Sequence, residues 1–138
     1  MEDIIDQSLK ELCDEMGCDY MSQATPTRIE AEWGSRALQG FPNRRFDFAI
    51  RIGARVIVVE VNLYASSKGG SKLKATAGEF IELERSLVAA GIDFVWVTDG
   101  PGWKTAKASL HEAFIANRYV MNMELLRQGV LRDILARA

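Results

Sequence analysis

The chain has 138 residues, of which 48% are hydrophobic and 26% charged, with a formal net charge of −2. These values predict one globular domain over residues 1–138 and exclude a disordered tail, a collagen-like repeat and a low-complexity segment. No apolar run approaches the ~20 residues of a membrane helix, and the first residues are acidic where a secretory signal is basic, so we expect no membrane partner and a cytoplasmic location. Two cysteines five residues apart, Cys13 and Cys18, also make a disulfide scaffold or a zinc site an unfavoured interpretation.

Hydrophobic spacing predicts helices and strands that alternate along the chain. A helix over 2–16 ends at Gly17, a second helix begins near Thr25-Pro26, and residues 34–45 form a loop. Alternation over 46–52 and a β-branched run over 55–63 predict a hairpin that turns at Gly53-Ala54. The remaining predicted elements are, in order, a loop over 66–71, a helix over 72–90, a strand over 92–98, a helix over 104–117, a short strand over 119–121 and a helix over 123–136. The order predicts an α/β (α+β) fold with a mixed central sheet flanked by helices.

Two carboxylates occupy matched places on the predicted hairpin. Asp47 lies six residues before Gly53, and Glu60 lies six residues after Ala54. Residues at equal distances from a two-residue turn pair across an antiparallel ladder, and two like charges there need a cation between them. Together with the backbone carbonyl of Val61, they would suit Mg²⁺. The alternative is structural: an acid that caps a turn and an acid that forms a surface ion pair.

Charge is unevenly distributed along the chain. Residues 1–32 carry a net −7, residues 33–74 a net +6 and residues 75–138 a net −1. A basic segment around two isolated carboxylates favours an anionic polymer as partner, although a solvated charged face is the simpler interpretation.

Several short motifs in fixed order resemble the DpnII/MboI-type restriction endonucleases, which are Type II enzymes within the PD-(D/E)xK nuclease superfamily. These motifs are the segments 45–48, 59–64, 69–74, 76–80, 96–100 and 102–103. The first two segments are Arg45-Phe46-Asp47-Phe48 and Val59-Glu60-Val61-Asn62-Leu63-Tyr64. The resemblance implies a restriction-endonuclease-like core and Mg²⁺-dependent cleavage of double-stranded DNA at GATC, with Mn²⁺ as a substitute ion. It also implies 5′-phosphate ends and a homodimer, since a palindromic site matches a two-fold axis.

Carried over to this sequence, the resemblance makes Asp47 and Glu60 the metal-binding carboxylates. Asn62 occupies the place where most of the superfamily has lysine, and an amide can only orient water or phosphate. Lys72, near a predicted helix start, is then the candidate amine. Candidates for an additional acid are Glu30 and, less favoured, Glu79, with Glu11, Glu15 and Glu32 as further possibilities. The candidate DNA contacts are Arg36, Asn43, Arg44, Arg45, Lys68 and Lys74.

Two other functions remain open from the sequence. The missing lysine at Asn62 motivates a catalytically weak or inactive DNA-binding module of the same fold. The basic segment could instead bind RNA or a protein, with the acids purely structural.

Overall fold

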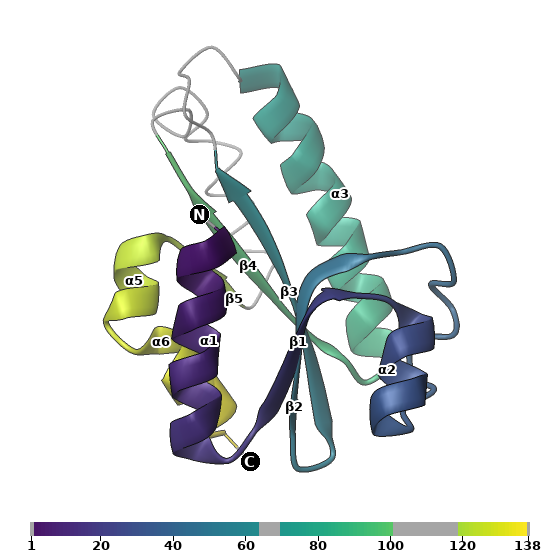
Figure 1. Cartoon of the computed structure of the whole chain (residues 1–138). Coiled ribbons are helices and arrows are strands. Elements are labelled where there is room, and N and C mark those ends of the chain that lie inside the picture. The colour runs from purple at the N-terminus through teal and green to yellow at the C-terminus, as the bar shows by residue number, and fades with distance from the viewer. Residues whose placement is uncertain (1, 64–69, 101–118, 138) are drawn as a thin grey trace. The chain divides into compact units, whose positions relative to one another are not determined.

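The computed structural model describes residues 2–63, 70–100 and 119–137. The predicted helix over 104–117 and Lys68 lie outside this range. The predicted loop over 66–71 lies partly outside it. Ten elements are described (Figure 1): α1 (Glu2–Met16), β1 (Asp19–Ala24), α2 (Pro26–Trp33), β2 (Phe46–Ile52), β3 (Arg55–Leu63), α3 (Gly70–Ala89), β4 (Asp93–Asp99), β5 (Tyr119–Met121), α5 (Met123–Arg127) and α6 (Val130–Leu135).

The strands form one sheet in the order β1-β2-β3-β4-β5. The pairs β1/β2 and β2/β3 are antiparallel, whereas β4/β5 is parallel. The predicted mixed sheet with helices is therefore confirmed. By their contacts the residues form two compact units, Met1–Glu60 with Leu87–Phe94 and Val61–Ser86 with Val95–Ala138. That residues 1–138 act as a single nuclease domain stays a prediction.

In the first unit, the hairpin is fixed by its two-residue turn. Gly53 adopts φ 59°, which a hairpin turn of this length requires and which glycine adopts at little cost. The β2/β3 register then runs from Ile52 opposite Arg55 to Phe48 opposite Val59. The hairpin expected from the sequence is confirmed, and its outer end is where the two matched acids lie.

Helix α1 contacts β1 through its apolar side and through one polar bond. Ile5 and Leu9 are buried, and the Tyr20 hydroxyl donates to Asp6 Oδ1 over 2.7 Å. Burial, followed by this bond and the charge of Asp6, raises the pKa of Tyr20 to about 12. Strand β1 itself was not predicted from the sequence.

The two cysteines lie side by side at the end of α1. Cys13 and Cys18 are joined by a disulfide. The backbone N–H groups of Gly17 and Cys18 both donate to the Cys13 carbonyl, so the chain folds back over the last helical turn and brings the two Cα atoms within 4.5 Å. This is a single local bridge at one helix end. It was not predicted from the sequence, where only a disulfide scaffold or a zinc site was weighed.

In the second unit, most side chains of β4 and β5 are buried. Trp96 lies opposite Val120 in the parallel pair, and both side chains are buried. The single terminal helix predicted over 123–136 is wrong: the structure has two helices, because Gly129 adopts a left-handed φ of 90° between them. Among the described residues, no helix is long and apolar enough to cross a membrane.

Candidate functional site

The β2/β3 hairpin brings Asp47 and Glu60 together. The β2/β3 register ends with Phe48 opposite Val59, and the same register continued by one residue places Asp47 opposite Glu60. A side-chain hydrogen bond joins the two carboxyl groups. The convergence that the sequence spacing predicted is therefore present.

Glu60 is a strongly perturbed acid. It is only 8% exposed. Burial raises its pKa to about 8, helped by the charge and hydrogen bond of Asp47 and opposed by the Arg44 guanidinium. That guanidinium lies 3.7 Å from Glu60 Oε1 and also stacks over the Phe46 ring, 5.6 Å from its centroid. Because one cation at this distance does not offset burial, the neutral form of Glu60 is favoured to a higher pH than in a free glutamate.

Two atoms at this place are buried without a hydrogen-bond partner: Oε1 of Glu60 and Nε of Arg44. A buried carboxylate oxygen without a donor is costly unless a cation or a donor satisfies it. Carboxylate oxygens are also the ligands that Mg²⁺ and Mn²⁺ favour. The donor set therefore fits a hard divalent ion, although among the residues that the structure describes no group of three or more His, Cys, Asp or Glu side chains is arranged to hold one.

A third carboxyl group comes from the start of α1. Burial raises the pKa of Glu2, and the charge and a hydrogen bond of Asp47 raise it further, whereas Arg45 lowers it. Sequence reasoning missed this residue. Glu30, which it favoured as the additional acid, forms an ion pair with Arg36 over 3.2 Å, and its role stays a prediction. The approach of a helix start to a hairpin depends on tertiary packing, so no local pattern could have revealed it.

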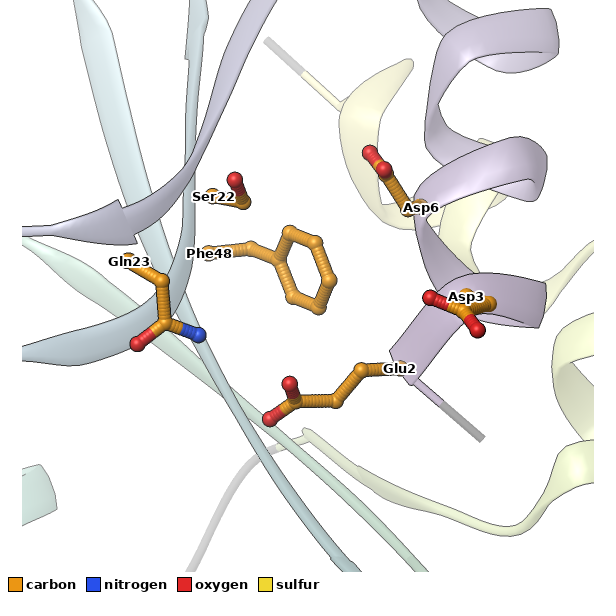
Figure 2. A pocket seen from close by; sticks show the side chains of 6 residues that line it. All are labelled: Glu2, Asp3, Asp6, Ser22, Gln23 and Phe48. Atoms are coloured by element: carbon orange, nitrogen blue, oxygen red, sulfur yellow. The ribbon is translucent and has the colours of Figure 1, made fainter.

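Glu2 also lines a pocket of about 130 Å³ in the first unit (Figure 2). The carboxylate of Glu2 and the amide of Gln23 extend into the same space beside the Phe48 ring. The complete lining consists of Glu2, Asp3, Asp6, Ser22, Gln23 and Phe48.

Gln23 is held in an unusual backbone conformation. In the β1/β2 ladder, Ser22 pairs with Phe48 and Ala24 with Phe46, which leaves Gln23 opposite Asp47. Gln23 has φ 50°, a left-handed value, and Arg28 Nη1 donates to the carbonyl oxygens of Ser22 and Gln23 over 2.7 and 3.0 Å. Such conformations persist only where the surroundings enforce them, and they cluster at functional sites.

Asn62 lies two residues after Glu60 in β3, and Val61 lies between them. Its side chain is half-buried, and its Oδ1 accepts a hydrogen bond from Trp96 Nε1 over 2.8 Å. The amide of Asn62 is therefore anchored by a buried indole.

The remaining predicted residues are distributed over loops and α3. Arg36, Asn43 and Arg45 are exposed in the segment before β2. Lys72 and Lys74 fall in the first turns of α3, and Glu79 is exposed further along that helix. The roles assigned to all of these residues stay predictions.

The chain is similar in sequence to known restriction enzymes. The model of the DpnII restriction endonuclease family matches residues 1–133. The chain is 39% identical over 140 residues to the Type II restriction enzyme MjaIII of Methanocaldococcus jannaschii, covering 98% of this chain and 48% of the relative. It is 38% identical over 138 residues to LlaDCHI of Lactococcus lactis, covering 97% and 45%, and 35% identical over 92 residues to DpnII of Streptococcus pneumoniae, covering 66% and 31%. The chain thus spans about half the length or less of these curated relatives. Since the family match extends over nearly the whole chain and the mixed sheet is of the restriction-endonuclease-like kind, the chain belongs to the DpnII restriction endonuclease family.

Proposed function

We propose that the protein is a divalent-metal-dependent endodeoxyribonuclease that cleaves double-stranded DNA. The single observation that supports this most strongly is the Asp47–Glu60 pair, in which a buried acid lies beside a second carboxyl group and has an oxygen without a hydrogen-bond partner. A proton between two carboxyl groups relieves the same repulsion that a divalent ion would relieve.

The proposed ion is Mg²⁺, with Mn²⁺ as a substitute. Asp47, Glu60 and the backbone carbonyl of Val61 would hold it, with Glu30 or Glu79 as the additional acid expected from the sequence and Glu2 as a further carboxyl group beside Asp47. When bound, such an ion lowers the pKa of a coordinated water and neutralises charge on the phosphate. The side chains of the protein would hold the DNA. In this proposal Asn62 and Lys72 contact the scissile phosphate. The basic segment holds the flanking phosphates through Arg36, Asn43, Arg44, Arg45, Lys68 and Lys74.

Sequence specificity follows from the family. We expect cleavage at GATC with 5′-phosphate ends, by a homodimer whose two-fold axis matches the palindrome. We expect these finer properties of proteins with the full length of the relatives. This chain spans about half of that length or less.

The test is cleavage of plasmid DNA in Mg²⁺ and in Mn²⁺, followed by sequencing of the ends. Wild-type protein should cut at one four-base site, and Asp47→Asn should abolish cutting while it still binds DNA. Asp19→Asn is the matched control, because Asp19 is an exposed acid on β1 that pairs with Arg51. Random ends would remove the specificity, and cleavage by Asp47→Asn at the wild-type rate would overturn the proposed site.

A second candidate is a DNA-binding module without catalysis, favoured by Asn62 at the place of the lysine. It predicts salt-dependent binding of duplex DNA and no cleavage in either ion. Equal affinity for RNA would instead support an RNA partner.

A further inference from the structure

The amide of Asn62 is fixed from one side by a tryptophan. Trp96 Nε1 donates to Asn62 Oδ1 over 2.8 Å, and both residues belong to the second unit. An indole N–H is a donor only, so the Asn62 atom that faces it must be the carbonyl oxygen. The orientation of the amide is therefore set by chemistry, and its two Nδ2 hydrogens are the donors left for another partner.

Trp96 is well suited to hold this orientation. Its side chain is fully buried and lies in β4 opposite Val120 of β5. The Phe80 ring of α3 meets it edge-on, with 5.0 Å between the centroids. A large side chain in such packing has one accessible rotamer, so the indole N–H stays in place.

Asn62 lies close to Glu60 along β3. Asn62 follows Glu60 by two residues in β3, and successive side chains of a strand alternate between its faces, so the two residues share a face. Non-bridging phosphate oxygens accept hydrogen bonds and do not donate them. An amide presented by its nitrogen matches such an oxygen, whereas one presented by its oxygen would repel it.

We infer that Trp96 is a positioning residue that keeps Asn62 turned as a hydrogen-bond donor to a phosphate oxygen of the bound DNA. This inference rests on the proposed function. Asn62 then supplies the donor part of what a lysine would supply, without its charge, and Trp96 acts only through Asn62.

The test is a double-mutant cycle on plasmid cleavage with Asn62→Ala, Trp96→Phe and the double variant. Trp96→Phe keeps a buried aromatic ring but removes the N–H. It should lower kcat about 10-fold with little change in KM, and Asn62→Ala should lower kcat by more. The double variant should match Asn62→Ala, since Trp96 has nothing left to position. Full multiplication of the two losses would overturn the inference.

Two further variants separate positioning from packing. Phe94→Leu reduces a fully buried aromatic side chain in the same strand without touching this bond, so it should lower the melting temperature and leave kcat within about 2-fold. Asn62→Asp keeps an oxygen acceptor for Trp96 but has no N–H to donate, so it should be as inactive as Asn62→Ala. An active Asn62→Asp would contradict the donor role.

A measurement without catalysis distinguishes failure of this inference from failure of the proposed function. In wild-type protein, the indole N–H proton of Trp96 should be protected from exchange, and Asn62→Ala should shift its resonance and speed its exchange. If the resonance behaves so but wild-type protein never cleaves DNA, the proposed function fails while the contact stands. If wild-type protein cleaves and the resonance is unchanged in Asn62→Ala, the inference fails alone.

Discussion

The carboxyl groups of Asp47 and Glu60 are joined by a hydrogen bond across the β2/β3 hairpin. Two ionised carboxylates cannot form such a bond, because neither has a proton to donate. Burial raises the pKa of Glu60 to about 8, which favours its neutral form. The protonation state of this pair is therefore expected to affect the stability of the folded protein and the binding of the proposed ion.

The first prediction concerns stability against pH. Between pH 4.5 and about 8, the unfolded chain releases the Glu60 proton while the folded protein keeps it, so the free energy of unfolding falls as pH rises. This carboxyl contributes at most about 1.4 kcal/mol per pH unit to that fall. Glu60→Gln mimics the protonated acid and should flatten the profile. Urea unfolding without divalent ions, from pH 4.5 to 8.5, measures the difference.

Addition of Mg²⁺ gives the matching control. The ion must displace the proton, so its stabilisation of wild-type protein should grow as pH rises through this window and should be absent in Glu60→Gln. Parallel profiles for the two proteins, with and without the ion, would show that Glu60 does not titrate there.

The second prediction concerns Glu2. Its carboxyl is hydrogen-bonded to Asp47 at the start of α1, so Glu2→Gln removes a charge next to the proposed ion. We expect a 10- to 100-fold loss of cleavage rate, together with a higher Mg²⁺ concentration for half-maximal rate. Asp14→Asn, an exposed acid on the same helix, should change neither. Wild-type metal dependence in Glu2→Gln would remove Glu2 from the site.

Local patterns predicted the parts of the site that depend on nearby residues. The two-residue turn at Gly53-Ala54 fixes the register, and counting outward from it placed Asp47 opposite Glu60. Likewise, Thr25 caps α2 and accepts a bond from the Arg28 backbone, as its position before Pro26 predicted.

Features that depend on distant packing were not predictable in this way. Strand β1 has only two buried side chains, Met21 and Ala24, and contains Asp19, which is a poor strand former. It is a strand because β2 offers a free edge. Glu2 reaches Asp47 for the same reason, since α1 packs on β1.

The third prediction concerns Arg44. Its guanidinium faces Glu60, so Arg44→Ala should lower stability by about 1 kcal/mol at pH 8.5, where Glu60 is charged, and by less at pH 5.5, where Glu60 is neutral. Loss of a phosphate contact should also weaken DNA binding and reduce the slope of affinity against salt by about 1. Arg85→Ala is the control, since Arg85 is exposed on α3 beside Glu82. Equal effects at both pH values would mean that the ion pair does not matter.

The fourth prediction concerns the backbone at Gln23. A left-handed residue with a Cβ costs about 1–2 kcal/mol more than glycine, so Gln23→Gly should be more stable than Gln23→Ala by about that amount. At Thr27, exposed in α2, the order should reverse, because glycine is unfavourable in a helix by about 1 kcal/mol. Thermal and urea unfolding of the four variants test this.

The same variants separate strain from chemistry. Both Gln23 substitutions remove the amide that extends into the pocket beside Glu2, so both should lose cleavage activity although only one relieves the backbone. Arg28→Ala removes the two bonds to the carbonyls of Ser22 and Gln23 and should lower stability by about 1 kcal/mol. In the Gln23→Gly background this loss should remain, because glycine accepts the conformation but still presents the carbonyls. Full activity in Gln23→Gly would show that the strained residue supports the strand and not the site.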